Sequence, residues 1–482
     1  MKKVLILLLS GLALFTSCKK FLDVNNTPNN PTTVPAATIL PNTLIALGFA
    51  NSNDLNRATS ALVQHIAGVA NQTAAYDVYA LDGAFDNQWN FEIYNGAINN
   101  LQILIDQYSS TSPAYSGVAK LEMAYAFSMA TDLWGDVPYS QAGQGLKFES
   151  PRFDKVQDIY QGNSASGIVS LFDLVKSGLA DLDKPTVFKP SAKDDIVYAG
   201  DLTKWKRMGN TLLLKFAIML TNANPALAKS TIQDVITGNN FINANNLDFE
   251  VPFGSAVGNQ NPIYSFNYVN RPGDQMLSTR LLNLVKSLND TVRLSKFFTK
   301  PTGIFTSFDN GSTAAPPGTT SRSQYGAYLI GTTGNAPIRL LTNFQVNFIL
   351  AEAALVLGTP GDANTLYQAG ITASMQKVGM TPAEIANYFT TNPTVVTLTG
   401  TPDQQLQQII TQKYIAWIGN GIEAFNDYRR TGYPQLTLVN NAAGDNPNVI
   451  PTRLPYTPAE LSRNPNAPNP RPKTDVKLWW AK

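Results

Sequence analysis

The sequence is poor in the residues on which much protein chemistry depends, with one cysteine and one histidine among 482 residues. A single cysteine, Cys18, has no partner for an internal disulfide. Zinc sites, Cys–His nucleophile pairs and multi-histidine iron sites need more such ligands than the chain supplies. The one histidine, His65, lies in the apolar stretch ALVQHIAGVA, which predicts a core or helix-face histidine. We therefore expect no cofactor.

The chain also lacks an excess of either charge. Lys and Arg number 36 against 34 Asp and Glu, and loss of Lys2 and Lys3 with an N-terminal signal would make the two counts equal. Because nucleic-acid binding requires a basic face, we expect no nucleic-acid partner. After the first 17 residues, no run of about 18 apolar residues is present that could span a bilayer.

The N-terminus, MKKVLILLLSGLALFTSC, has the pattern of an export signal. Two lysines precede an apolar run, and two small residues stand directly before Cys18. This order resembles a bacterial lipobox, in which the signal is cleaved before a cysteine that becomes diacylated. An ordinary secretory signal is the alternative. We predict a lipoprotein signal peptide over 1–17, lipidation at Cys18 and a tether over 18–40, whose Asn, Pro and Thr content is typical of turns.

Helical periodicity dominates from about Leu40 onward. Residues 118–132 are apolar on nearly all sides, which predicts a deeply buried helix. Apolar residues at steps of three and four from Trp205 to Met219 predict a second helix, capped by Asp201 or Thr203. A third is predicted over 341–355, with Gly358 ending it.

A fourth helix is predicted from Pro402 to about Ile418, because Thr401 and Gln404 have the spacing of a capping box. Glu352, inside the third apolar helix, needs a partner, and Arg429 or Arg430 is a candidate. Between the helices lie long irregular segments rich in Asn, Pro and Gly, at 249–279, 301–335 and 440–482. We expect a mainly α fold, with helix pairs stacked beside a loop-built layer.

A series of motifs occurs in a meaningful order along the chain. They are TDLWGDVPYS (131–140), PRFDKVQDIYQ (151–161), YAGDLTKWKRMGNTLLLKFAIML (198–220), NDTVRLSKFF (289–298), FILAEAALVLG (348–358), YQAGITASMQKVG (367–379), WIGNGIEAFNDYRRTGYP (417–434) and RLPYTPAELSRNPN (453–466). Together with the lipobox, this series resembles the SusD/RagB family of Bacteroidetes outer-membrane lipoproteins, in its SusD-like, starch-binding-associated branch.

The resemblance implies a fold in which four tetratricopeptide-like helix pairs support a variable ligand-binding face, so that 41–482 would form one nutrient-binding domain. It also implies a partner, a SusC-like TonB-dependent outer-membrane transporter. The lipoprotein would lie over that barrel on the cell exterior, capture a nutrient and act as the lid. Ligands in the family are mostly oligosaccharides, with peptides in the RagB type, and members are binders, not enzymes.

Two segments have the aromatic, amide and charged composition that sugar binding requires. In 71–95 the candidate ligand-binding residues are Tyr76 and Trp89, and in 261–275 they are Tyr264, Tyr268, Arg271 and Asp274. Trp89 and Ile93 are four residues apart, so Trp89 is alternatively a core residue of a helix running to about Gln107. The tyrosines of 261–275 are alternatively transporter contacts, since interfaces favour Tyr and Arg.

Two other classes of function remain open. A glycan hydrolase would need paired carboxylates, and no acidic pair stands out in a catalytic context. Ser374 and Lys377 match a Ser-x-x-Lys pattern, but the motifs that accompany it in serine hydrolases of that kind are missing. A scaffold that binds only proteins through its helix pairs is the second alternative.

Overall fold

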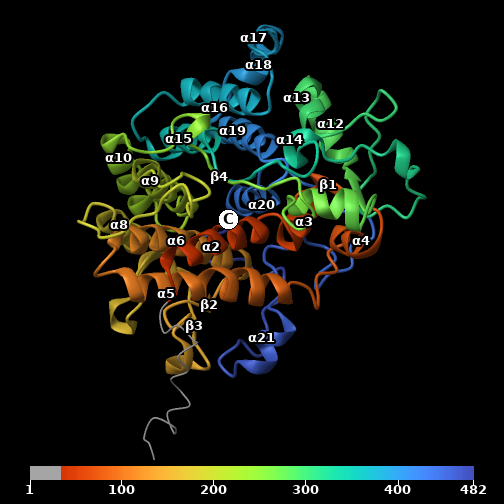
Figure 1. Ribbon diagram of the computed structural model, residues 1–482. Coiled ribbons are helices and arrows are strands. Elements are labelled where there is room, and N and C mark those ends of the chain that lie inside the picture. The colour runs from red at the N-terminus through yellow and green to blue at the C-terminus, as the bar shows by residue number, and fades with distance from the viewer. Residues whose placement is uncertain (1–33) are drawn as a thin grey trace, which may run out of the picture.

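The computed structural model describes residues 34–482, and it is mainly helical (Figure 1). Consecutive helices pack side by side and form a stack. Its members are α2 (Ala36–Ala50), α5 (Asn99–Tyr108), α6 (Pro113–Trp134), α8 (Leu171–Asp181), α9 (Leu202–Met219), α10 (Pro225–Gly238), α15 (Asn343–Leu357), α16 (Ala363–Lys377), α19 (Pro402–Ala416) and α20 (Gly421–Thr431).

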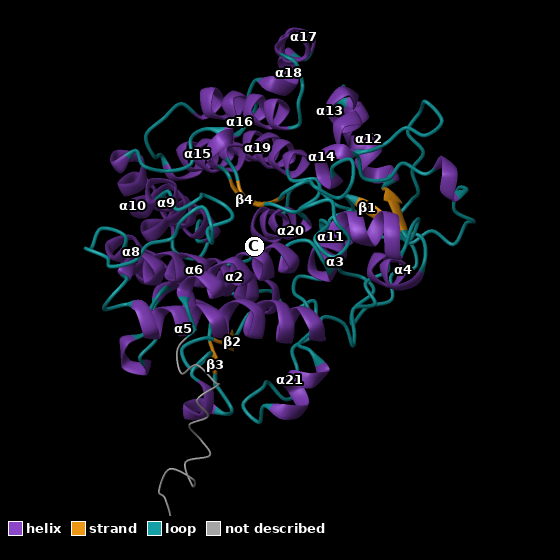
Figure 2. Ribbon diagram, viewed as in Figure 1, coloured by secondary structure: helices purple, strands orange, loops and turns teal. Residues whose placement is uncertain are grey.

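A second layer, on the right in Figure 1, consists of short helices joined by long loops (Figure 2). It contains α3 (Asp54–Leu62), α4 (Asn71–Asp77), α11 (Pro262–Tyr264), η7 (Ser265–Asn270), α12 (Thr279–Ser287), α13 (Thr291–Phe297), η8 (Thr319–Ser321) and α14 (Ala327–Ile330). The remaining helical segments are η3 (Gln88–Ile98), η4 (Gly145–Phe148), α7 (Val156–Gln161), η5 (Ser164–Ser166), η6 (Asn245–Leu247), α17 (Pro382–Thr391), α18 (Pro393–Val396) and α21 (Pro458–Arg463).

Three small antiparallel sheets tie distant parts of the chain together. Their pairs are β1 (Ile66–Gly68) with β5 (Gln275–Leu277), β2 (Val137–Pro138) with β3 (Phe153–Asp154), and β4 (Phe249–Val251) with β6 (Ile338–Leu341). In the first sheet Ile66 lies opposite Leu277 and Gly68 opposite Gln275. This pairing brings the two segments of predicted ligand residues next to each other.

The predicted helix ends agree with the structure where they depend on local chemistry. The Asp201 carboxylate accepts hydrogen bonds from the Thr203 and Lys204 amides and caps α9. Thr401 and Gln404 form the expected capping box of α19. Gly358 ends α15 with a φ of 63°, a conformation that glycine adopts without strain.

Two expected boundaries differ from the structure. Leu341, predicted as helical, belongs to β6, where it lies opposite Phe249 in β4. α2 begins at Ala36, inside the segment 18–40 predicted as a tether, so the last residues of that segment are helical. Cys18 and the predicted signal peptide lie outside the described residues.

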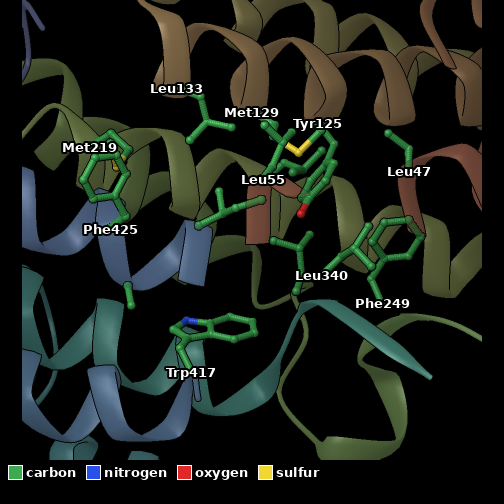
Figure 3. Close-up of a cluster of buried hydrophobic side chains, with 14 of the residues drawn as sticks. Leu47, Leu55, Tyr125, Met129, Leu133, Met219, Phe249, Leu340, Trp417 and Phe425 are labelled. Carbon is green, nitrogen blue, oxygen red and sulfur yellow. The ribbon is translucent and has the colours of Figure 1, made fainter. Parts of the chain in front are cut away.

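One hydrophobic core joins the stack and the loop-rich layer (Figure 3). It includes Leu47 of α2, Leu55 of α3, Tyr125 of α6, Phe249 of β4 and Phe425 of α20. His65 is fully buried, as predicted, with Nε2 3.1 Å from the carbonyl oxygen of Tyr414. Burial lowers the pKa of His65 to about 3, so the ring is neutral.

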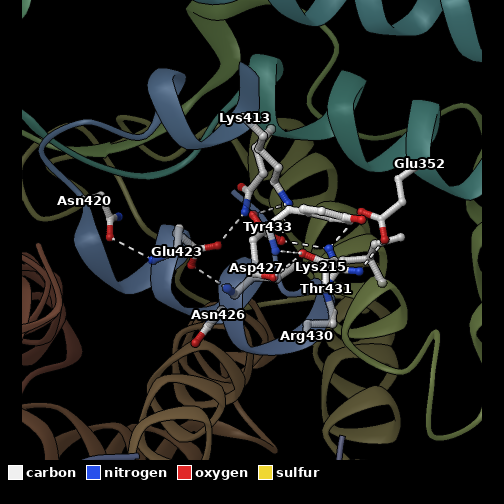
Figure 4. A network of polar contacts seen from close by, with 12 residues as sticks. Lys215, Glu352, Lys413, Asn420, Glu423, Asn426, Asp427, Arg430, Thr431 and Tyr433 are labelled. Carbon is white, nitrogen blue, oxygen red and sulfur yellow. Dashed lines mark hydrogen bonds and ion pairs between the residues drawn. The ribbon is translucent and has the colours of Figure 1, made fainter. Parts of the chain in front are cut away.

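A buried polar network fixes α15, α19 and α20 to one another (Figure 4). Arg430 of α20 pairs with Glu352 of α15, with Nη2 2.8 Å from Oε2, as the sequence predicts for Glu352. The same guanidinium contacts Asp427 at 2.8 Å, and Lys413 of α19 lies 2.9 Å from the second oxygen of Asp427. Burial opposes ionisation, but Lys413 and Arg430 hold the pKa of Asp427 below its usual value.

Candidate ligand-binding face

The two segments that the sequence singles out meet on the loop-rich side of the molecule. The Asn71 side-chain amide, at the start of α4, donates to both carboxylate oxygens of Asp274, at 3.1 and 3.0 Å. The carbonyl oxygen of Asp274 also accepts from the Val69 amide at 2.8 Å. We call the surface formed by 71–77 and 264–274 the α4–η7 face.

Tyr264 and Tyr268 lie one helical turn apart on this face and stack on each other. Their ring centroids are 5.6 Å apart and the ring planes differ by 13°. Tyr264 is half-buried, whereas 36% of the Tyr268 surface is exposed. The Tyr268 hydroxyl donates to the carbonyl oxygen of Tyr325 at 2.6 Å, and burial of the hydroxyl raises the pKa of Tyr268 to about 12. The stack is therefore a fixed aromatic plane that reaches solvent.

Arg271 and Asp274 have different surroundings despite being three residues apart. The Arg271 side chain is exposed, and it makes no hydrogen bond or ion pair with any residue in 34–482. The Asp274 side chain is buried, and Asn71 occupies both its oxygens. Arg271 is thus free to bind a ligand, whereas Asp274 positions α4 against the 261–275 segment.

Tyr76 and Trp89, predicted as ligand-stacking aromatics, are buried, with exposed fractions of 1% and 2%. Tyr76 stacks on Phe85 with a centroid distance of 5.6 Å. Trp89 meets the Trp134 ring edge to face at 5.0 Å. The expectation of exposed aromatic planes at these two positions is therefore corrected, since both rings fill the core.

The alternative interpretation of Trp89 as a core residue is confirmed. η3 and α5 form a continuous helical segment from Gln88 to Tyr108. Trp89 and Ile93 both face inward from it. The four-residue spacing that made Trp89 ambiguous is the spacing of one helix face. One edge of Trp89 still lines a cleft, which is described below.

Arg57, a cation of α3 at this face, is not among the residues that the sequence predicts. Its guanidinium lies 3.8 Å from the centre of the Phe266 ring in η7 and pairs with Asp54. Burial lowers the pKa of Arg57 to about 10, against the opposing effect of nearby acids that include Asp274. No local pattern marks Arg57, because its ring partner comes from a segment more than two hundred residues later in the chain.

The weak Ser-x-x-Lys match does not form a nucleophile–base pair. Ser374 is buried and accepts from Arg293 Nη1 at 3.3 Å. Lys377 Nζ lies 2.7 Å from Asp248 and 3.0 Å from Glu250. Among residues 34–482 there is also no group of three or more His, Cys, Asp or Glu placed to hold a metal ion.

A stack of helix pairs beside a loop-built layer is the architecture of a helical-repeat protein. The chain belongs to the SusD-like family described as starch-binding and associating with the outer membrane, whose model matches residues 28–457. This confirms the resemblance drawn from the motif series. In the part of the chain that the structure describes, no helix is both long and apolar enough to cross a bilayer.

Solved structures share this fold. A chitin-binding protein matches with a TM-score of 0.78 and 24% identity, over 93% of this chain and 100% of that one. A chitin-binding SusD homologue from Flavobacterium johnsoniae matches with a TM-score of 0.75 and 22% identity, over 92% and 97%. A SusD homologue from Bacteroides uniformis matches with a TM-score of 0.74 and 22% identity, over 93% and 98%. No curated protein sequence matches the chain significantly.

Proposed function

We propose that this protein binds an oligosaccharide at the outer membrane and delivers it to a SusC-like TonB-dependent transporter, for which it acts as the lid. The observation that carries the proposal is the stacked Tyr264–Tyr268 pair beside the free Arg271. The membership in a starch-binding family and the structural likeness to two chitin-binding proteins support it.

The chemistry of the α4–η7 face suits a sugar. A pyranose ring has an apolar C–H face, which packs on an aromatic plane such as that of Tyr268. Its rim of hydroxyls needs donors and acceptors at the edge of that plane. Arg271 provides donors, and Asn270 is an exposed amide next to it. Binding is the role that this arrangement supports, and we propose no catalytic step.

The proposed location is the outer surface of the outer membrane, with a lipid anchor at Cys18. A single acyl chain holds a protein only marginally, so a diacylated cysteine fits stable anchoring. Mass spectrometry of the membrane-extracted N-terminal peptide tests this, with diacylglycerol on Cys18 as the expected result. Protease treatment of intact cells tests the orientation, and full protection of the protein would contradict the role as a lid.

Peptide binding, as in the RagB type, is the second candidate. The observation that favours it is Arg271, which is exposed and has no partner within 34–482, because a guanidinium binds a carboxylate well. Affinity electrophoresis against neutral glycans, with calorimetry against peptide mixtures, separates the two candidates. Retardation by a glycan supports the first, and peptide binding without any glycan binding supports the second. Co-purification with the transporter and no binding of either ligand would favour a protein-binding scaffold.

A further inference from the structure

A second surface of the molecule carries the chemistry of a sugar site. It is a cleft of about 510 Å3 between η3, the start of α5, the loop that joins β2 to β3, and α21. Volumes of about 300–1,000 Å3 are typical of ligand pockets. These elements lie in the lower part of Figure 1, whereas α4 lies at the right. We propose that this cleft is a second binding site for a neutral oligosaccharide, an inference that rests on the proposed function.

The walls of the cleft combine aromatic rings with amides. The aromatic side chains are Phe148, Tyr94 and one edge of the buried Trp89. The body of Trp89 is held by Trp134, and the Tyr94 hydroxyl donates to the Pro138 carbonyl oxygen at 2.8 Å. Trp89 and Tyr94 are therefore fixed before a ligand arrives, which reduces the entropy cost of binding.

Two asparagines on one helix face present an oriented donor and acceptor. Asn99 Nδ2 donates to Asn95 Oδ1 at 2.8 Å. The remaining amide nitrogen of Asn95 and the remaining carbonyl oxygen of Asn99 have no hydrogen-bond partner within 34–482. If the side-chain amides of Asn95 and Asn99 were both flipped, so that oxygen and nitrogen exchanged places, one donor and one acceptor would still lack a partner in 34–482. Such a pair matches adjacent hydroxyls of a sugar, each of which both donates and accepts.

The opposite wall adds another free donor. The Gln141 side-chain oxygen accepts from the Arg152 amide at 2.9 Å, and its nitrogen has no partner among the described residues. Gly143, with a φ of 72°, brings this loop close to α5. A Cβ at Gly143 would lie 3.1 Å from Gln102 Cβ and 3.5 Å from Asn99 Oδ1. The β2–β3 loop thus holds its amides opposite those of α5.

The charges of the cleft select a neutral ligand. Two carboxyl groups, Glu149 and Glu460, line it, and no lysine or arginine does. Burial raises the pKa of Glu460, and hydrogen bonds from Asn464 and Trp89 oppose the shift. An anionic ligand would meet these two carboxyl groups, which is unfavourable, and the nearby Lys147 is engaged with Gln144 and the Phe148 ring. Sugar hydroxyls, by contrast, donate well to carboxylates.

Isothermal titration of the full-length protein with chitohexaose, maltohexaose and cellohexaose tests the second site. We expect two binding sites in the wild type and one in the double variant Asn95→Ala/Asn99→Ala. Asn100→Ala is the matched control, because Asn100 lies on the same helix, bonds to the carbonyl oxygens of Asn95 and Gly96, and does not line the cleft. The control should retain two sites. Identical titrations of the double variant and the wild type would overturn the inference.

A companion variant at the α4–η7 face separates failure of this inference from failure of the proposed function. If Tyr268→Ala weakens all of the observed binding and Asn95→Ala/Asn99→Ala changes nothing, the proposed function stands and the second site is refuted. If the wild type binds no neutral glycan of the panel, both are refuted. Hydrogen exchange gives an independent readout. The probe that binds should protect amides in 88–99 and 139–151, and unchanged exchange there would refute the cleft as a site.

Discussion

Charged side chains have opposite surroundings in the stack and on the α4–η7 face. In the stack, Arg430 is fully buried and shared between Glu352 and Asp427, so its donors are used inside the protein. On the face, Arg271 is exposed and has no partner in the described chain. The paired charges of the stack hold its helices to one another, whereas the ligand recognition that we propose would use a cation and rings that the fold leaves accessible.

Breaking the network in the stack should have the largest effect on stability. We expect Arg430→Met to lower the free energy of unfolding by about 3–5 kcal/mol, because it leaves Glu352 and Asp427 buried without this cation. Chemical denaturation measures the change. Arg271→Met is the matched control on the face and should stay within about 0.5 kcal/mol of the wild type. Equal effects of the two variants would invalidate the comparison.

Trp89 tests whether a predicted ligand aromatic belongs to the core. Because its ring packs against Trp134, Phe153 and Tyr456, Trp89→Ala should destabilise the protein by about 3–5 kcal/mol. The melting temperature should fall correspondingly in a thermal scan. An unchanged melting temperature with weakened glycan binding would show that Trp89 contacts the ligand and does not stabilise the core.

Much of the stack can be predicted from sequence because its signals are local. The caps at Asp201 and Thr401 and the ending of α15 at Gly358 each depend on residues within one turn. Leu341 shows the limit of this approach. Its periodicity fits the helix that follows, but pairing with Phe249 makes it a strand residue, and no local window contains that partner.

The face is less predictable for a related reason. Composition identified both segments, and the pair Tyr264–Tyr268 is indeed accessible. Composition cannot separate an exposed ring from a buried one, so it predicts Tyr76 as a ligand residue, although Tyr76 is buried and stacks on Phe85. Arg57 reaches Phe266 only through the tertiary fold.

Glu122, buried in α6, gives the stack a dependence of stability on pH. Burial raises the pKa of Glu122 well above its ordinary value, and neither of its carboxyl oxygens has a hydrogen-bond partner among the described residues. Above the pKa of the unfolded chain, the folded state therefore holds a proton that the unfolded state releases. The free energy of unfolding therefore falls as pH rises above the pKa of the unfolded chain, by up to about 1.4 kcal/mol per pH unit.

Glu122→Gln removes this titration. We expect the variant to gain stability relative to the wild type as pH increases from about 4.5, in urea denaturation at a series of pH values. A constant difference between the two proteins across that series would show that Glu122 has the same proton affinity in the folded and unfolded states.

The smallest expected effect on stability is that of Tyr268→Ala, and it sharpens the comparison most. The Tyr268 ring stacks on Tyr264 at the surface, so its removal should change the melting temperature little. Loss of a stacking plane of this kind costs about 0.5–1.5 kcal/mol, which is roughly a 2- to 10-fold weaker affinity at the α4–η7 site.

Tyr268→Phe keeps the ring and should bind nearly as well as the wild type, which separates stacking from the hydroxyl bond to Tyr325. Calorimetry on the glycan that the wild type binds measures both variants. A loss of stability in Tyr268→Ala as large as that expected of Trp89→Ala would show that Tyr268 is a core residue. The α4–η7 face would then not differ from the stack at this position.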